Sequence, residues 1–266
     1  MAVEKRSGSS AVQGRLWGQR PRDWAEVQED TVRPVFVEVV DHLVGPGVEV
    51  LDVGCGSGRF IELATAAGAR VVGIDAAAEL LEVASERTPS ASVRAGEMED
   101  LPFADASFDL VTGFNSFQYA ADPAAALREA RRVVRPEGRV VAMIWGTVEE
   151  CESAAYLAAL GRLMPPAPLG APGPFALSQP GVLEALIREA GLEPSRRRVV
   201  EASWGYPDLE TALRGLLSAG PAQRAIENSS QEAAAQAVTE AIAPYRRANG
   251  TYLLRNHFHY VVATPA

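Results

Sequence analysis

The sequence predicts an α/β fold in which helices cover both faces of a mostly parallel sheet. Strand-like and helix-like segments alternate through the first half of the chain, as they do in β-α-β units. One strand, residues 48–53, is mostly Val and Leu and runs directly into a turn that contains Gly54, Gly56 and Gly58. Because ligands bind beyond the carboxyl ends of the strands in such sheets, we expect a binding site at this turn.

Hydrophobic spacing and turn signals give the elements of the first half in order. Short apolar runs indicate strands, and apolar residues three or four apart indicate helices. The expected strands span residues 48–53, 70–75, 91–94, 108–113 and 139–145. The expected helices span residues 30–43, 59–67, 78–87 and 123–134. A glycine turn that joins a strand to a helix is also expected to present free backbone N–H groups to a ligand.

The second half is less regular. MPPAPLGAPG, residues 164–173, is expected to be a linker. An amphipathic helix with Ser178 as N-cap and Gly191 as C-cap follows, and then a strand over residues 196–204. Residues 209–217 and 231–245 have helical spacing, and the closing segment, residues 251–265, is extended. These two helices interrupt the sheet before its last strand, so we expect a helical lid at about residues 207–247.

Composition narrows the classes of protein. The 266 residues are 47% hydrophobic and 22% charged, which suits one large globular domain. A net charge of −9 argues against a nucleic-acid partner. No apolar run is long enough to span a membrane, and the N-terminus lacks the apolar core of a signal peptide, so we expect a cytoplasmic location after a disordered start at residues 1–13. Two cysteines and three histidines in no cluster predict neither disulfides nor a metal site.

The glycine turn differs from the Gly-x-Gly-x-x-Gly fingerprint of dinucleotide-binding proteins. Arg59 occupies the position of the third glycine of that fingerprint, and Asp52 is not part of it. The segment VEVLDVGCGSGRF instead resembles motif I of the class I S-adenosylmethionine-dependent methyltransferases, in the form LDVGCGSG. Residues 95–111, AGEMEDLPFADASFDLV, resemble the stretch GDAEDLPFPDNSFDLV of the same family. The earlier RLWGQRPRDWAEVQED looks like the start of a bacterial small-molecule subgroup, type 11-like, whose N-terminal segment folds over the cofactor.

The resemblance implies a Rossmann-like, seven-stranded sheet whose last strand is antiparallel, within a single domain over residues 14–266. It also implies S-adenosyl-L-methionine as cofactor, covered by residues 14–29. The implied activity is in-line transfer of a methyl group to a small, apolar or aromatic metabolite, for which alignment of the acceptor is most of the task. We expect a monomer or a homodimer.

The spacing of the motifs and the resemblance together predict which residues contact the cofactor. Asp75, twenty-one residues after Gly54, is placed to accept both ribose hydroxyls of an adenosine, or else to cap the next helix. The resemblance implies that Glu97, in place of the usual aspartate, accepts from the adenine amino group, and that the Met98 backbone contacts the ring; a plain polar loop is the alternative. The full expected set is Trp17, Trp24, Asp52, Gly54, Cys55, Gly56, Gly58, Asp75, Ala76, Glu97, Met98, Phe114, Asn115 and Gln118.

Aromatic residues mark the expected acceptor site. Trp17 and Trp24 stand in an otherwise polar leader, where they cover the cofactor, form a dimer contact or cover the core. Tyr119 and His257 are the candidates for a general base, although His257 has a structural role as its alternative. The expected acceptor residues are Phe117, Tyr119, Trp145, Phe175, Trp204 and Tyr206.

Three other functions remain open from the sequence. The fold and cofactor can support a reaction without methyl transfer, for example a cyclisation, and only formation of S-adenosylhomocysteine with product would separate the two. A nicotinamide-dependent oxidoreductase is disfavoured by Arg59 and by the match at residues 97–103. A non-catalytic binding subunit would bind cofactor without turnover.

Overall fold

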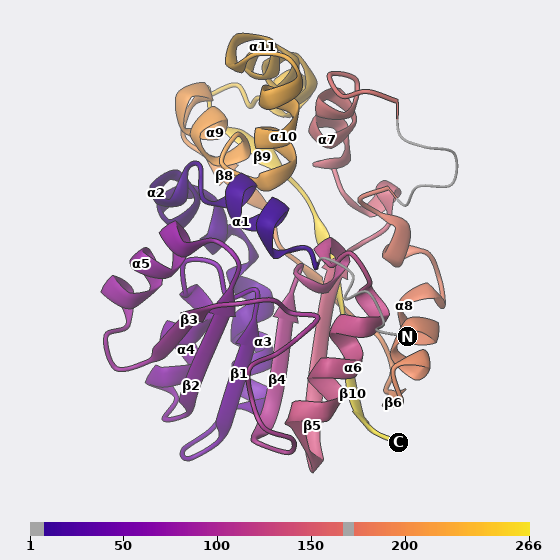
Figure 1. Cartoon of the computed structure of the whole chain (residues 1–266). Coiled ribbons are helices and arrows are strands. Elements are labelled where there is room, and N and C mark those ends of the chain that lie inside the picture. Colours follow the sequence, from indigo (N-terminus) through magenta and orange to yellow (C-terminus); the bar gives the residue numbers. More distant parts are fainter. Residues whose placement is uncertain (1–7, 167–172) are drawn as a thin grey trace.

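The structure is a computed structural model that describes residues 8–166 and 173–266. Its sheet has the order β3-β2-β1-β4-β5-β10-β6, with β7 also paired to β10 (Figure 1). Strands β1 to β5 run parallel, whereas β10 is antiparallel to β5, β6 and β7. The seven-stranded sheet with an antiparallel last strand is thus confirmed. The edge position beside β10 is divided between two short strands, β6 and β7. The strands are β1 (Glu49–Val53), β2 (Arg70–Asp75), β3 (Ser92–Ala95), β4 (Phe108–Phe114), β5 (Val134–Trp145), β6 (Leu192–Pro194), β7 (Arg198–Glu201) and β10 (His257–Pro265).

Two apolar clusters fill the two faces of the sheet. Successive residues of β1 point to opposite faces, so Val50 belongs to one cluster while Leu51 and Val53 belong to the other. Helices α3 (Arg33–Leu43), α4 (Arg59–Ala66) and α5 (Ala78–Arg87) pack on the Val50 side. Helices α6 (Pro123–Val133) and α8 (Val182–Glu189) pack on the other side. Helices therefore cover both faces, as the alternation of segments predicted.

The chain before the sheet forms a leader, residues 8–32. It contains α1 (Ser10–Trp17), the short α2 (Pro21–Asp23), a π-helical turn (Trp24–Gln28) and a 3-10 turn (Glu29–Val32). The expectation of disorder up to residue 13 is therefore wrong from Ser10 onward, and residues 1–7 lie outside the described residues. The physical reason is that distant carboxylates bind the first N–H groups: Glu99 accepts from Ser9 at 2.9 Å and Glu97 from Ser10 at 2.7 Å.

A cap of helices lies over one end of the sheet, with α1 beneath it (Figure 1). The cap consists of α7 (Ala154–Gly161), α9 (Leu209–Leu216), α10 (Gly220–Asn228), α11 (Gln231–Ile242) and a two-stranded sheet of β8 (Trp204–Tyr206) and β9 (Tyr252–Leu254). Sequence spacing predicted two helices between the last strands, whereas the structure has three. The additional helix is α10, whose start is set by Pro221 in its first turn.

Smaller differences also follow from local chemistry. Ser178 is not the N-cap of α8, because Gly181 holds that position with φ +80° and the Ser178 hydroxyl donates to the Trp145 carbonyl at 2.8 Å. Residues 167–172 of the expected linker lie outside the described residues. In the described part of the chain, no helix has the length and apolar character that crossing a bilayer requires.

Candidate functional site

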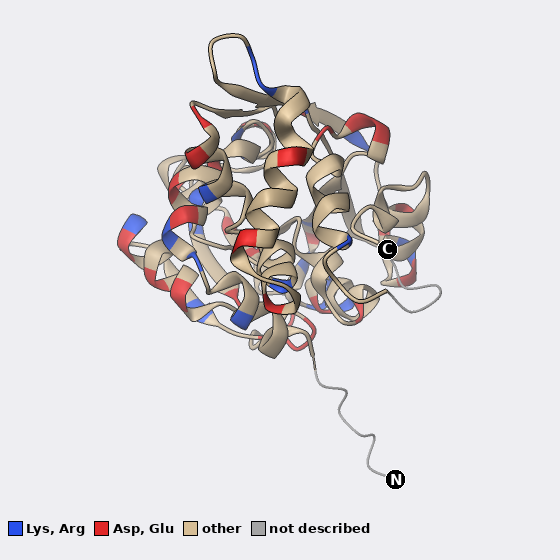
Figure 2. Cartoon of the chain, turned by 90° about the horizontal axis from the view of Figure 1, so that it is seen from above, with Lys and Arg blue, Asp and Glu red and all other residues tan. Residues whose placement is uncertain are grey.

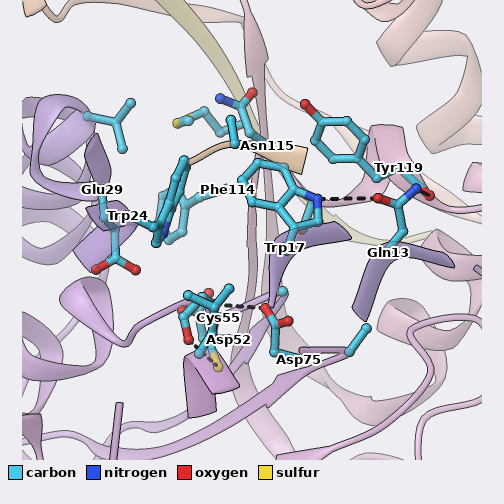
Figure 3. Close-up of a pocket in the computed structure, with 18 of the residues that line it drawn as sticks. Gln13, Trp17, Trp24, Glu29, Asp52, Cys55, Asp75, Phe114, Asn115 and Tyr119 are labelled. Atoms are coloured by element: carbon cyan, nitrogen blue, oxygen red, sulfur yellow. Dashed lines mark hydrogen bonds between the residues drawn. The ribbon is translucent and has the colours of Figure 1, made fainter. Parts of the chain in front are cut away.

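A pocket lies between the carboxyl ends of the strands, the leader and the cap (Figure 3). It is bounded below by residues that follow β1, β2, β3 and β4, and above by the leader, α7, β8 and the start of α10. Most of the residues expected from the sequence line it: Trp17, Trp24, Asp52, Gly54, Cys55, Gly56, Asp75, Ala76, Glu97, Met98, Phe114, Asn115, Tyr119, Trp145 and Trp204.

The glycine turn requires glycine for conformation and for packing. Gly54, Gly56 and Gly58 have φ of +74°, +56° and +82°, in the left-handed region that favours glycine. A Cβ at Gly56 would lie 2.9 Å from Glu29 Oε1 and 3.4 Å from Trp24 Nε1. Side chains of the leader are therefore in contact with this turn at Gly56.

The N–H groups of the turn are not free, which corrects the expectation from the sequence. Gly56 donates to Asp75 Oδ2 at 2.9 Å and Ser57 to Glu29 Oε1 at 2.8 Å. Gly54 and Cys55 donate to the Ile74 carbonyl, and Gly58 donates to the Cys55 carbonyl. A pyrophosphate here would find no free donors and would face two carboxylates, so the turn does not suit a dinucleotide.

One end of the pocket is acidic. Asp52, Asp75, Glu97 and Glu29 line it, and among the described lining residues there is no Lys, Arg or His. Burial raises the pKa of Asp52 to about 7, and it raises the pKa values of Asp75 and Glu29 as well. Figure 3 shows Asp52, Cys55 and Asp75 together on one side of Trp17 and Trp24. Glu29 is paired with Arg87 behind the pocket wall, whereas Asp52 and Asp75 have no such partner. Ionisation of these two groups is costly without a nearby cation, so the end favours a positively charged ligand.

Asp75 is anchored at both carboxylate oxygens. Its Oδ2 accepts from Gly56 and its Oδ1 accepts from the N–H of Ala77 at 2.8 Å. It therefore fixes the residue before α5, but it is not the helix cap that was the alternative to the ribose role, because Ala77 holds the N-cap position. Each oxygen retains a second lone pair toward the pocket, so a hydroxyl-bearing ligand can still bind.

Glu97 has a partner that the sequence did not predict. Its carboxylate accepts from the N–H groups of Ser10 at 2.7 Å and Glu99 at 3.2 Å. Partial burial raises the pKa of Glu97, but these hydrogen bonds outweigh burial and lower it. The side chain thus fastens the start of α1 to the sheet while it lines the pocket.

The two leader tryptophans pack over the pocket against one another. Their ring centroids are 4.8 Å apart in an edge-to-face arrangement, and the Trp17 ring lies 5.5 Å from that of Tyr119. Trp17 Nε1 donates to Gln13 Oε1 at 3.2 Å, whereas Trp24 Nε1 is buried without a partner among the described residues. Both rings are thus part of the pocket wall.

The other end of the pocket is aromatic and apolar, and we call it the acceptor chamber. Asn115, in the left-handed region at φ +52°, directs its amide to this side, and the Tyr119 hydroxyl points the same way (Figure 3). Burial raises the pKa of Tyr119 to about 12, so this phenol is a proton donor rather than a base near neutral pH. The chamber is lined by Val32, Phe36, Phe114, Asn115, Tyr119, Met143, Trp145, Tyr156, Leu157, Trp204, Ala219 and Pro221.

Some expected acceptor residues lie behind the pocket wall. The Phe117 ring packs under Gly113 in the apolar cluster of the opposite face. The Tyr206 hydroxyl donates to Gln28 Oε1 at 2.8 Å, and the Phe175 ring lies 5.9 Å from that of Trp145. These three side chains support lining residues but do not line the pocket themselves.

Three further expected residues also lie outside the lining. His257 Nδ1 lies 3.2 Å from the backbone oxygen of Glu150, so the last strand does not bring this imidazole to the pocket. Gly58 packs against Ala84 of α5. The Gln118 amide lies outside the lining but close enough to the Tyr119 hydroxyl to oppose the rise in its pKa that burial causes.

The structure adds lining residues that the sequence analysis missed. Glu29 reaches the glycine turn from the leader, and Phe36 comes from α3. Tyr156 and Leu157 come from α7, whose sequence AAYLAALG is almost entirely apolar. A short helix that is apolar on most of its surface must be covered on several sides. The apolar sequence of α7 was therefore the feature from which its place in the pocket wall could have been predicted.

Comparisons with known proteins agree on one family. A family model described as "Methyltransferase domain" matches residues 51–142. The chain is 32% identical over 195 residues to the ubiquinone biosynthesis O-methyltransferase of Xanthomonas axonopodis pv. citri, covering 69% of this chain and 78% of that protein. It is 31% identical over 193 residues to the 27-O-demethylrifamycin SV methyltransferase of Amycolatopsis mediterranei, covering 68% and 69%.

Solved structures show the same fold. The geranyl diphosphate C-methyltransferase of Streptomyces coelicolor, solved with S-adenosyl-L-homocysteine, has a TM-score of 0.54 at 14% identity, and the match covers 97% of this chain and 98% of that one. The match covers a smaller share of three other curated relatives, namely 33%, 65% and 63% of their own lengths.

Proposed function

Because the chain belongs to the class I S-adenosylmethionine-dependent methyltransferases, we propose that it transfers the methyl group of that cofactor to a small, apolar or aromatic metabolite. The observation that carries the proposal is a single pocket that joins an acidic end to an aromatic one. The acidic end lies at the glycine turn, and the aromatic end lies under the cap.

The acidic end fits the cofactor of this family. S-adenosylmethionine carries a sulfonium cation and an ammonium group, and when bound it supplies an electrophilic methyl group. Asp52, Asp75 and Glu97, which have no cation among the described lining residues, suit these charges, and aromatic faces such as those of Trp17 and Phe114 suit a sulfonium. The Trp24 indole N–H, buried and unpartnered beside Gly56, is a free donor for the cofactor.

We assign roles to individual residues within this proposal. Asp75 accepts the ribose hydroxyls with its remaining lone pairs. Met98 contacts the adenine, and Glu97 accepts from the adenine amino group in addition to its bonds with the leader. Asn115 and Phe114 surround the methionine end, so the methyl group is directed toward the acceptor chamber.

The elements above the pocket complete the proposal. Residues 14–29 cover the cofactor and residues 207–247 form the lid over the acceptor. The two together exclude water and align the acceptor oxygen or nitrogen with the methyl group, which is the main contribution a protein makes to such a displacement.

The size and charge of the molecule support a small acceptor. The chamber is enclosed by the cap, and the relatives named for ubiquinone biosynthesis and for 27-O-demethylrifamycin SV are named for small molecules. Lys and Arg are interspersed with Asp and Glu over the chain, and its net charge is −9 (Figure 2). A nucleic-acid acceptor would need a basic face.

Calorimetric titration with S-adenosylmethionine, S-adenosylhomocysteine and NAD tests the cofactor. We expect binding of the two sulfur compounds and none of NAD. Asp75→Ala should weaken both by about 1.5–3 kcal/mol, the range for hydrogen bonds to a charged group. Acceptors are then screened for S-adenosylhomocysteine formed in step with methylated product. Failure of the wild-type protein to bind either sulfur compound would refute the proposal, and so would cofactor binding with turnover confined to proteins or nucleic acids.

A further inference from the structure

Three carboxyl groups at the acidic end of the pocket differ in the groups that stabilise a negative charge on them. Glu29 pairs with the guanidinium of Arg87 and accepts from the N–H and the hydroxyl of Ser57. Asp75 accepts from two backbone N–H groups. Asp52 accepts from a single hydroxyl among the described residues. Because a buried carboxylate is stable only with a cation or several donors, Asp52 is the least stabilised anion of the three.

The described surroundings of Asp52 provide no positive charge. Its side chain is 2% exposed, and the hydroxyl that donates to it at 2.7 Å is that of Thr112 on β4. The charged groups that act on it are two further carboxylates, Glu29 from the leader and Asp75 at the end of β2. Cys55 of the glycine turn is a thiol whose pKa is raised by burial, so it is uncharged near neutral pH. The described residues of α3, α4 and α5 that line the pocket are apolar.

Asp52 therefore holds a proton more readily than an ordinary aspartate does. Burial raises its pKa to about 7; the Thr112 hydroxyl opposes this rise, whereas the charges of Glu29 and Asp75 add to it. At pH 7 about half of the molecules then carry the proton. A positive charge brought to within about 4–6 Å favours the ionised form of a carboxyl group and lowers its pKa by about 1–3.

A ligand is expected beside these carboxyl groups on separate grounds. The Ser116 hydroxyl lines the pocket next to Gly54, belongs to a side chain that is 6% exposed and has no partner among the described residues. Under the proposed function that ligand is S-adenosylmethionine, which carries one more positive charge than S-adenosylhomocysteine. The acidic end of the pocket therefore meets two ligands of different charge in each reaction cycle.

From this arrangement we infer that the Asp52 carboxyl gives up a proton to solvent when the sulfonium form of the cofactor binds and takes one back in the product complex. The inference rests on the proposed function and adds a proton exchange to it. During transfer the acceptor atom provides the electron pair of its new bond to the methyl carbon and loses its own proton to solvent, while the pair of the broken C–S bond returns to sulfur. The pocket thereby loses one positive charge, and protonation of Asp52 removes one negative charge, so the two complexes have nearly the same net charge.

Calorimetric titration of the wild-type protein with each of the two sulfur compounds tests this exchange. Each titration is done at pH 7 in two buffers of different ionisation enthalpy, because the difference in measured heat gives the number of protons released. S-adenosylmethionine should release about 0.4 proton more than S-adenosylhomocysteine, the value for a lowering of the Asp52 pKa by about one. The same lowering should raise the ratio of the two affinities, in favour of S-adenosylmethionine, about fivefold or more between pH 5.5 and pH 8.

Three variants identify the group that titrates. Asp52→Asn should abolish the difference in proton release between the two ligands, and comparison with it subtracts the protons that belong to the ligands' own amino groups. Thr112→Val removes the hydroxyl that stabilises the carboxylate, so the difference should be largest at a higher pH than in the wild type. The matched control is Glu97→Gln in the same pocket. Partial burial raises the pKa of Glu97 but its hydrogen bonds lower it by more, so this group is already charged near neutral pH and its replacement should leave the difference unchanged.

The outcomes separate this inference from the proposed function. Equal proton release with both ligands in the wild type, or a difference that survives in Asp52→Asn, would overturn the proton exchange while the cofactor assignment stands. Loss of the difference in Glu97→Gln would overturn the assignment to Asp52. If Asp52→Asn does not fold, an unchanged pH optimum in Thr112→Val overturns the inference on its own. If the wild-type protein binds neither sulfur compound, the proposed function fails first.

Discussion

At the scale of single residues, Asp52 is the group most altered by the fold. It is 2% exposed, and its carboxylate accepts from the Thr112 hydroxyl at 2.7 Å. Burial raises its pKa to about 7, and the neighbouring carboxylates of Glu29 and Asp75 act in the same direction. The residue therefore changes charge close to neutral pH, next to the turn on which the cofactor is proposed to bind.

We predict that this carboxyl makes the fold less stable as pH rises. In the unfolded chain an aspartate has its ordinary pKa of about 4. Between pH ~4 and pH ~7 the native state keeps a proton that the unfolded state has released, so stability falls across this window, by an amount on the order of 4 kcal/mol for Asp52. Asp52→Asn should remove most of that slope. Urea unfolding at pH 5 and at pH 8 measures it, and an unchanged slope in the variant would contradict the prediction.

Site residues were predictable where one backbone feature determines them. Asp52 and Asp75 lie at the carboxyl ends of β1 and β2, and the glycines follow β1, so the strand register places them at one edge of the sheet. The partners of a side chain were not predictable in the same way. Glu97 binds the N-terminus of a helix 87 residues away, and the His257 imidazole lies by the backbone oxygen of Glu150, outside the pocket lining. Such contacts depend on packing between distant elements.

At the scale of elements, a buried ion pair joins the leader to α5. Arg87 of α5 lies 2.5 Å from Glu29, and the two side chains are 14% and 6% exposed. Arg87 also donates to the carbonyls of Ser57 and Ala25, at 2.7 Å and 3.1 Å. One guanidinium thus connects three segments that form the cofactor end of the pocket.

Removal of one member of this pair should be costly. Arg87→Met leaves Glu29 charged and buried, which is expected to lower the free energy of unfolding by about 3–5 kcal/mol. The double variant Glu29→Gln with Arg87→Met should recover a large part of that loss, because no unpaired charge remains.

The matched control is Arg214→Met. Arg214 also pairs with the leader, at 2.8 Å from both Asp23 and Glu26, but its side chain is 42% exposed, so its removal should lower the free energy of unfolding far less than that of Arg87. Urea denaturation of all four proteins decides between these expectations. Equal losses for the two arginines would show that burial of the first pair has no special energetic effect.

Helices and strands with a clear hydrophobic period could be predicted from the sequence, whereas short or irregular elements could not. Helices α4, α5 and α6 begin at the predicted residues because glycine, an apolar face or proline marks each start. The helix α10 was missed because Gly220 and Pro221 are typical of a turn, although Pro is also well placed in a first helical turn. The leader was expected to be polar and partly disordered, since nothing local reveals the carboxylates that hold it.

At the scale of the whole molecule, the pocket is closed by two elements from opposite ends of the chain. Helix α1 of the leader packs against α10 of the cap, and the π-helical turn of the leader packs against α9. The architecture of the sheet was predictable from the alternation of segments. The position of the leader on the cap was not, because it joins residues about 200 positions apart through side-chain packing and ion pairs such as that of Arg214 with Asp23.

The contact between α1 and α10 provides a test of this closure. A Cβ added at Gly220 would lie 2.6 Å from Trp17 Nε1, so Gly220→Ala must displace the indole or the helix. Overpacking of this kind typically costs about 1–3 kcal/mol. Because Trp17 lines the pocket, we expect weaker S-adenosylhomocysteine binding, roughly tenfold, although the substitution lies in the cap and far from the glycine turn.

The control for this substitution is Gly161→Ala, at the end of α7 in the same cap, where an added Cβ meets no atom within 4 Å. It should leave affinity unchanged and the unfolding midpoint equal or slightly higher, since alanine reduces the freedom of the unfolded chain. Calorimetry gives the affinities, and thermal unfolding without ligand gives the midpoints. If Gly220→Ala lowered the midpoint but bound S-adenosylhomocysteine as wild type does, the leader would contribute to stability alone. If its affinity fell and that of Gly161→Ala did not, the cap would act on the cofactor end through Trp17, which joins the two halves of the pocket into one site.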